Sequence, residues 1–350
     1  RRRELLRPGV FYLPIPSVFY YYLGGARQVD SSWASVTQLM DAQRRVWSRE
    51  ILDALEIPAD VLPPIVAPGT DIGQLHAPLA EAAGVTRARL IAVAAHDTAC
   101  AFAAAPLDNP AQSLIVSSGT WSLIGKLRPE PVTTPEAMAC NISNEGGVGN
   151  VRVLKNCMGT WIVQELRRIW RLADGREMDW NEIVALADAA PAFGAFIDPD
   201  DPGFFNPANM ETAIADFCRR TGQTPPASRG ACLRAVYESL ALKYRTVNER
   251  ICAVTGTTTR SVHIVGGGSK NERLNQFVAD ALDLPVLAGP EEATAIGNGM
   301  IQALGLGAFP SLADALPIVR RSFPIRRYTP REPDAWRKAY QRFRRVTAPA

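Results

Sequence analysis

The chain has 350 residues, of which 47% are hydrophobic and 21% are charged, a composition typical of a globular protein and not of a disordered or fibrous one. This length allows two domains, because a single hydrophobic core stops growing at about 250 to 300 residues. The net charge of +3 is too small to indicate binding to nucleic acid or to a membrane surface.

Targeting and metal-binding signals are also missing from the sequence. Prolines 8, 14 and 16 interrupt the apolar run behind the N-terminal arginines, and no apolar stretch reaches the roughly 18 residues of a membrane span, so we predict neither a secretion signal nor a membrane helix. Six cysteines without a C-x-x-C pair indicate free thiols in a reducing cytoplasm, and with only three histidines we expect no metal site built from protein side chains.

The first chemically suggestive element lies near residue 90. Residues 1–88 read as short helices and proline-rich loops. Residues 90–95 form an apolar run bounded by polar residues, which is typical of a buried central strand. His96, Asp97 and Thr98 follow it, and an alanine-rich stretch predicts a helix over 99–105 that Asp97 or Thr98 can cap.

The rest of the chain alternates predicted strands and helices. Residues 113–118 and 121–126 predict a hairpin with its corner at Gly119 and Thr120. In chain order there follow a strand over 151–156, a helix over 159–171, a loop over 197–209, a long helix over 231–254, a strand over 261–265, a triglycine turn at 266–268, a helix over 271–282, a strand over 286–288 and helices over 292–304 and 333–346. This alternation predicts an α/β fold with a substantially parallel sheet. The last helix carries a basic face, which we interpret as solvated in preference to a nucleic-acid site.

Asp97 is the candidate catalytic base. In α/β sheets ligands gather beyond the carboxyl ends of the strands, where a carboxylate can accept a proton from a bound alcohol. The alternative is a simple helix N-cap, and the tripeptide alone does not decide between the two.

Two glycine-containing turns are candidates for holding a phosphate or a nucleotide. Residues 117–122 (SSGTWS) place backbone N–H groups and hydroxyls at a hairpin tip, although such corners are also ordinary turns. Residues 265–271 run from a strand through three glycines into a helix, which lets backbone approach a nucleotide closely. The alternative there is a tight turn without a ligand. No G-x-x-x-x-G-K-[ST] sequence occurs in the chain, which excludes a P-loop.

Taken together, these motifs resemble the FGGY family of carbohydrate kinases, and in particular its members that phosphorylate L-rhamnulose. The segments that carry the resemblance are 95–99 (AHDTA), 117–125 (SSGTWSLIG), 144–147 (NEGG), 153–156 (VLKN), Met158, Gly159, Trp161, Gln164 and 263–268 (HIVGGG). Further similar segments extend the resemblance from about Pro8 to about Gly307.

The resemblance implies a fold of two actin-like, ribonuclease-H-like ATPase domains, the first truncated at its N-terminus. We expect residues 1–106 to be the remainder of the N-terminal domain, 107–310 the C-terminal, nucleotide-binding domain, and 311–350 a tail with a terminal helix. It implies an ATP-dependent, magnesium-requiring kinase that converts L-rhamnulose to L-rhamnulose 1-phosphate in rhamnose catabolism. Its partners would be a small ketose and ATP, without nucleic acid or membrane.

Site residues follow from the resemblance one by one. Asp97 matches the proton acceptor. The residues that match sugar contacts are His96, Asp97, Thr98 and Asn156, and those that match nucleotide contacts are Thr120, Gln164 and Gly267.

The family pattern also begins with an acidic, glycine-containing strand and hairpin that this sequence does not contain, so we expect the chain to be a fragment with little activity alone. Two alternatives to an L-rhamnulose kinase stay open. One is an FGGY kinase for L-fuculose or a related ketose. The other is a non-catalytic module that binds sugar or nucleotide.

Overall fold

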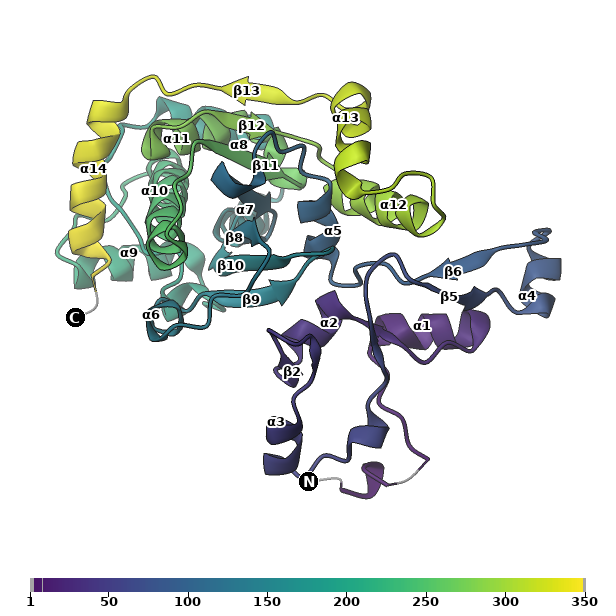
Figure 1. Ribbon diagram of the computed structural model, residues 1–350. Coiled ribbons are helices and arrows are strands. Elements are labelled where there is room, and N and C mark those ends of the chain that lie inside the picture. The colour runs from purple at the N-terminus through teal and green to yellow at the C-terminus, as the bar shows by residue number, and fades with distance from the viewer. Residues whose placement is uncertain (1–2, 8, 349–350) are drawn as a thin grey trace. The chain divides into compact units, whose positions relative to one another are not determined.

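The computed structural model describes residues 3–7 and 9–348, and Figure 1 labels most of its helices and strands. The chain forms two compact units. Unit 1 comprises Arg1–Leu107, Lys126–Leu154 and Glu292–Phe323, and unit 2 comprises Asp108–Gly125, Lys155–Glu291 and Pro324–Ala350. Strands β8 (Trp121–Arg128) and β10 (Val151–Met158) each contain a point of division.

Unit 1 is built mainly from short elements, as residues 1–88 predicted. Its helices are η1 (Arg3–Leu5), α1 (Ile15–Gly24), α2 (Ser31–Val36), α3 (Arg49–Ala54), η2 (Ala59–Val61), α4 (Ala77–Ala82), α5 (Asp97–Ala103), α6 (Pro135–Ala139), α12 (Ala293–Gly305) and α13 (Leu312–Ser322). Its strands are β1 (Val29–Asp30), β2 (Met40–Asp41), β3 (Val46–Trp47), β4 (Ile65–Val66), β5 (Asp71–Gln74), β6 (Arg89–Ile91) and β9 (Ser143–Gly146).

The predicted central strand over 90–95 is wrong. Only Arg89–Ile91 is a strand, and β6 pairs antiparallel with β5 in a two-stranded sheet. Beyond it the backbone finds other partners, since the N–H of Ala92 donates to the carbonyl of Thr70 and that of Val93 to the Tyr20 hydroxyl. A run of apolar residues predicts burial, and it does not say which strands, if any, will pair with it.

Helix α5 is nevertheless buried, because it packs closely on α12. Gly297 makes this approach possible: a Cβ there would lie 2.0 Å from the carbonyl oxygen of Cys100. Ala94, Ala99, Cys100 and Ile301 form the apolar cluster around the crossing.

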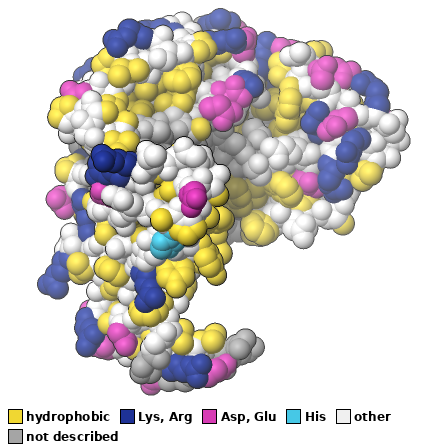
Figure 2. Space-filling model, turned by 90° about the vertical axis from the view of Figure 1, so that its right-hand side faces the viewer, with side chains coloured by type: hydrophobic (Ala, Val, Ile, Leu, Met, Phe, Trp, Pro, Cys, Tyr) yellow, Lys and Arg dark blue, Asp and Glu magenta, His cyan; other side chains and the backbone are white. Residues whose placement is uncertain are grey.

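Apolar side chains are also exposed in unit 1. Those in and just before α1 include Phe11, Tyr12, Ile15, Phe19 and Tyr22, with exposed fractions between 46% and 71%. Figure 2 shows hydrophobic side chains in yellow on the face turned to the viewer. None of the described helices is long and apolar enough to cross a membrane.

Unit 2 contains the longer elements. Its helices are η3 (Pro110–Gln112), α7 (Trp161–Asp174), α8 (Trp180–Ala189), η4 (Pro202–Phe204), α9 (Met210–Arg220), α10 (Arg229–Thr255), η5 (Gly267–Lys270), α11 (Glu272–Leu282) and α14 (Pro333–Val346). Its own strands are β7 (Ser113–Ser118), β11 (Ser261–Val265), β12 (Val286–Ala288) and β13 (Arg326–Tyr328). The hairpin and the elements predicted from 151 onwards are confirmed within a few residues at their ends.

The main sheet has the strand order β13-β12-β11-β7-β8-β10-β9 (Figure 1). Strand β11 pairs parallel with β7 and β12, whereas β8 is antiparallel to β7, β13 to β12 and β9 to β10. The expectation of a substantially parallel sheet therefore holds only for the adjacent strands β12, β11 and β7. The antiparallel part arises because short turns join β7 to β8 and β9 to β10, and short turns allow only antiparallel pairing.

Helical periodicity predicts the buried faces of unit 2 well. Five side chains at helical spacing along α10 are fully buried, namely Val236, Leu240, Tyr244, Val247 and Ile251. Helix α10 packs against α8 and α11. Helix α14 has the bounds predicted for it, and Trp336, Tyr340 and Phe343 are buried. Its amphipathic pattern is thus a core-facing one.

Candidate functional site

Asp97 lies at the first turn of α5 with its side chain exposed. Its Oδ1 accepts hydrogen bonds from the backbone N–H of Thr98 at 2.6 Å and from the Thr98 hydroxyl at 3.2 Å. Neither residue is the N-cap that the sequence suggested, since His96 holds that position without a side-chain bond to the helix. The carboxylate is thus accessible to a substrate alcohol, as a general base must be.

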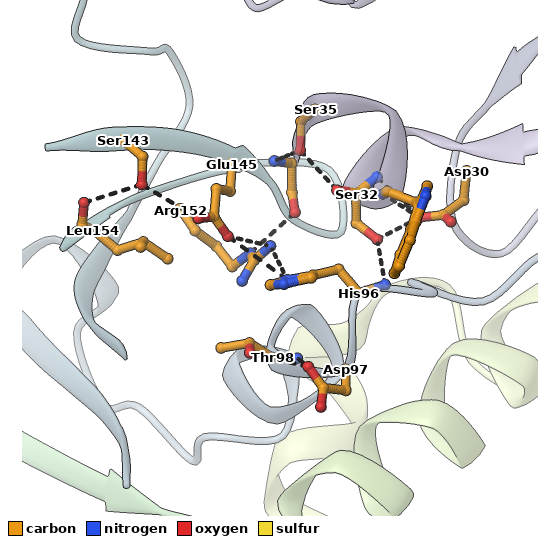
Figure 3. A network of polar contacts seen from close by, with 12 residues as sticks. Asp30, Ser32, Ser35, His96, Asp97, Thr98, Ser143, Glu145, Arg152 and Leu154 are labelled. Atoms are coloured by element: carbon orange, nitrogen blue, oxygen red, sulfur yellow. Dashed lines mark hydrogen bonds and ion pairs between the residues drawn. The ribbon is translucent and has the colours of Figure 1, made fainter. Parts of the chain in front are cut away.

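His96 is joined to a buried charged pair (Figure 3). Arg152, on β10, is fully buried and its Nη2 lies 3.0 Å from Nδ1 of His96 and 3.1 Å from Oε2 of Glu145, on β9. The Nε of Arg152 donates to the carbonyl of Gly146 at 3.0 Å. Burial, together with the positive charge of Arg152, lowers the pKa of His96, so the imidazole is neutral at pH 7.

The backbone of His96 is held by a second polar chain. Its N–H donates to the Ser32 hydroxyl at 3.2 Å, and that hydroxyl donates to Oδ1 of Asp30. Asp30 is buried and caps α2 by accepting from the N–H groups of Ser32 at 2.9 Å and Trp33 at 3.3 Å. Burial raises the pKa of the Asp30 carboxyl. Helix α2 and the His96 segment are therefore fixed together in unit 1.

The predicted nucleotide contacts lie in unit 2. Thr120, at the tip of the β7–β8 hairpin, is exposed, and its hydroxyl lies 3.4 Å from the side-chain amide of Gln164 on α7. The tip is fixed from behind, because the backbone N–H groups of Gly159 and Trp161 both donate to the carbonyl of Thr120. A Cβ at Gly159 would lie 2.6 Å from the carbonyl oxygen of Gly119, which requires glycine at this approach.

The triglycine turn lies against the same hairpin. A Cβ on Gly268 would meet the Ser118 hydroxyl at 2.0 Å, and Gly266 has φ +84°. Gly267, in contrast, is exposed with open space beside its Cα. Thr120, Gln164 and Gly267 therefore belong to one region of unit 2 with accessible backbone and hydroxyl groups, which suits a phosphate or nucleotide.

Asn156, the fourth predicted sugar contact, lies apart from the other three in the chain and belongs to unit 2. Its side chain is exposed on β10. The strand is anchored just beyond it, where Asp200 accepts from the N–H of Met158 at 2.9 Å and pairs with Lys243 at 2.9 Å. Lys243 also contacts Asp198 at 2.7 Å.

Sequence reasoning did not assign a role to Asp30, Glu145 or Arg152. Glu145 lies within the segment 144–147 that carries the resemblance. Arg152 lies inside an apolar strand, and this position could have indicated a paired arginine, because a fully buried arginine is rare unless it is paired. Asp30 gave no such signal. Among the residues that the structure describes, no group of three or more His, Cys, Asp and Glu side chains could hold a metal ion.

The chain belongs to the FGGY family of carbohydrate kinases. The model for the family's N-terminal domain matches residues 6–103, and that for its C-terminal domain matches residues 114–306. The domain boundaries predicted at 106 and 310 stay predictions.

Within this family the chain is similar to rhamnulokinases. It is 41% identical to rhamnulokinase from Bacteroides thetaiotaomicron over 332 residues, which are 94% of this chain and 67% of the relative. It is also 41% identical to rhamnulokinase from Pectobacterium carotovorum subsp. carotovorum over 96% of this chain and 66% of the relative. The chain thus spans about two thirds of the length of these relatives.

A solved structure shares the fold. Gluconate kinase from Lactobacillus acidophilus superposes with a TM-score of 0.74 at 16% identity, covering 97% of this chain and 68% of that one. Together with the family match, this confirms the prediction of an α/β kinase fold of the actin-like, ribonuclease-H-like kind.

Proposed function

We propose that the chain carries the catalytic base and part of the substrate sites of an ATP-dependent kinase that phosphorylates the 1-hydroxyl of L-rhamnulose. The observation that carries this proposal is the 41% identity to rhamnulokinases through 94–96% of the chain. The exposed carboxylate of Asp97 beside a neutral His96 supports it chemically.

In this mechanism Asp97 accepts the proton of the 1-hydroxyl while the oxygen attacks the γ-phosphorus of ATP and ADP leaves. His96, Thr98 and Asn156 orient the ketose. Thr120 and Gln164 contact the nucleotide through hydroxyl and amide groups, and Gly267 lets backbone approach it. Magnesium enters as part of the MgATP substrate, because magnesium in such sites is held mainly by phosphates and water.

The product distinguishes this proposal from the alternatives. Incubation of the chain with ATP, magnesium and either L-rhamnulose or L-fuculose, followed by mass spectrometry of the sugar phosphate and coupled detection of ADP, gives a direct comparison. L-Rhamnulose 1-phosphate as the faster product supports the proposal. Faster turnover of L-fuculose would assign the related kinase. Because the chain alone is expected to have little activity, a non-catalytic module would be assigned only if a version that also carries the family's N-terminal strand and hairpin binds both ligands without product.

We also propose that the activity resides in the cytoplasm. All six cysteines are free, and four of them are buried. Burial raises the pKa of Cys100 and Cys232 to about 12, so these thiols are unreactive packing groups. Free thiols of this kind fit a reducing compartment.

A further inference from the structure

The buried pair Arg152 and Glu145 contacts the candidate sugar site without being part of it. Arg152 is fully buried, and neither residue is among the predicted substrate contacts. Burial lowers the pKa of Arg152 to about 10, so the guanidinium is still charged at neutral pH. A buried ion pair contributes little net stability to a fold, because the free energy lost on removing both charges from water offsets their attraction. Apolar residues of the same volume are often as stabilising.

The geometry determines which ring nitrogen of His96 carries the proton. A guanidinium has donors and no acceptor, so the 3.0 Å contact from Nη2 of Arg152 requires Nδ1 of His96 to accept. The competing arrangement would have Nδ1–H donate to Glu145, but the distance to Oε2 is 3.6 Å, which is too long for a hydrogen bond. Glu145 is instead committed to Arg152 at 3.1 Å and accepts from Ser143 at 3.2 Å.

We propose that Arg152 and Glu145 are positioning residues that hold His96 as the neutral Nε2–H tautomer, so that His96 donates a hydrogen bond from Nε2 to an oxygen of the ketose. His96 retains 22% side-chain exposure while its Nδ1 edge faces the buried guanidinium. The other edge is therefore the one available to a ligand. The charged groups facing the ring are Arg152, Glu145 and Asp97.

A fixed donor has a chemical consequence for recognition. A keto oxygen can only accept a hydrogen bond, whereas an Nδ1–H ring would offer it an Nε2 acceptor and repel it. Since His96 precedes Asp97, the donor stands next to the group that deprotonates the reacting alcohol. This part of the inference rests on the proposed function, and the tautomer itself does not.

The tautomer can be measured without a substrate. In the 350-residue chain labelled with nitrogen-15 at histidine, only three residues contribute ring signals, and H96Q identifies those of His96. We expect a neutral ring protonated at Nε2 from pH 7 to pH 9. A ring protonated at Nδ1, or a charged ring at pH 7, would overturn the proposal.

The positioning role needs a variant that leaves no buried charge unpaired. R152M with E145Q removes both charges together, so it avoids the folding defect expected of R152M alone. In this double variant we expect both tautomers of His96 to appear. An unchanged ring would show that Arg152 does not set the tautomer.

Ligand binding gives the second readout. Calorimetry should show about a tenfold loss of L-rhamnulose affinity in the double variant, the equivalent of one hydrogen bond, with ADP affinity unchanged. In H96Q the side-chain amide occupies the place of Nε2 and donates a hydrogen bond whether or not Arg152 and Glu145 are present. Adding R152M and E145Q to H96Q should therefore reduce the L-rhamnulose affinity little further. Full additivity would indicate a merely structural role. If the unmodified chain binds no ketose at all, the proposed function fails while the ring measurement still decides the tautomer.

Discussion

Asp97 illustrates how far a single residue can be understood from sequence. The tripeptide His96-Asp97-Thr98 identifies the carboxylate, and the structure adds that it is exposed and accepts from Thr98. The strand that was expected to end directly before His96 and Asp97 ends at Ile91, six residues before Asp97. The partners that fix His96 could not be predicted, because Asp30 and Arg152 are distant in the chain and only tertiary packing brings them to it.

In a version that also carries the family's N-terminal strand and hairpin, Asp97→Asn should reduce kcat for L-rhamnulose by about 10²- to 10⁴-fold, the range typical of a lost general base. The asparagine amide is nearly isosteric and cannot accept the proton, so ketose affinity should change little. Initial rates and calorimetry on the same preparation measure both effects. Asp53→Asn, an exposed carboxylate on α3 that pairs with Arg49, is the matched control, and equal rates in the two variants would remove Asp97 from the mechanism.

Asp30 makes a prediction about pH. Burial raises the pKa of its carboxyl above the ordinary 3.8, so folding favours the protonated form. That contribution to stability is complete below pH 3.8 and is lost as the pH rises through the folded-state pKa. Asp30→Asn keeps an oxygen that caps α2 and has no charge to bury. The free energy of unfolding of Asp30→Asn, relative to that of the unmodified chain, should therefore increase as the pH rises from 3.8 through the folded-state pKa. At pH 7 the variant should be the more stable of the two.

Chemical denaturation at a series of pH values measures this difference. Asp30→Ala is the control, because it also has no charge but loses the cap, so it should be less stable than Asp30→Asn by about 0.5 to 2 kcal/mol at every pH. An Asp30→Asn variant that is destabilised at pH 7 as much as Asp30→Ala would mean that the charge of Asp30 is needed in the fold.

At the scale of elements, periodic patterns predicted more than apolar runs did. Helices α10 and α14 bury the side chains that their spacing selects, because a 3.6-residue repeat specifies a face. The run 90–95 specifies burial alone, and its hydrogen bonds go to Thr70 and Tyr20. The β7–β8 hairpin was predictable because its turn chemistry is local.

The crossing of α5 and α12 depends on one glycine. Gly297→Ala would place Cβ 2.0 Å from a backbone carbonyl of α5, which cannot rotate away. We expect a loss of stability of about 1 to 3 kcal/mol, as is typical of overpacking, and lower activity, because α5 begins with Asp97.

Gly299→Ala is the control within the same helix. It is exposed with nothing within 4 Å of the added methyl, so the better helix propensity of alanine should raise stability by up to about 1 kcal/mol. Midpoints of chemical denaturation compare the two variants. If both alanines had the same effect, the close approach of α5 and α12 would not be needed for stability.

On the scale of the whole molecule, the predicted site residues divide between two compact units. His96, Asp97 and Thr98 belong to unit 1, whereas Thr120, Asn156, Gln164 and Gly267 belong to unit 2. The family resemblance assigns them to two ligands, and the boundary expected at residue 106 divides them in the same way. Sequence alone could not show that unit 1 also includes 126–154 and 292–323 from later in the chain.

This division predicts separate patterns of ligand protection. A ligand that binds only the native state stabilises what it contacts, by about 2.7 kcal/mol at 100 times its dissociation constant. ADP should therefore slow hydrogen exchange in the hairpin around Thr120, at the start of α7 and in the turn at Gly267. L-Rhamnulose should slow hydrogen exchange in 95–103. If Asn156 contacts the sugar, L-rhamnulose should also slow exchange in 155–158.

Exchange measured by mass spectrometry, with each ligand alone, tests this pattern. Thr120→Val keeps the branched shape without the hydroxyl and should weaken the protection by ADP, but not that by the ketose. A pocket of about 470 Å³ between α9 and the start of α10, lined by Arg219, Ser228 and Arg229 among others, offers the nucleotide phosphates a competing basic site. Protection confined to 211–232 would place ADP there, and the assignment of Thr120, Gln164 and Gly267 to the nucleotide would then be wrong.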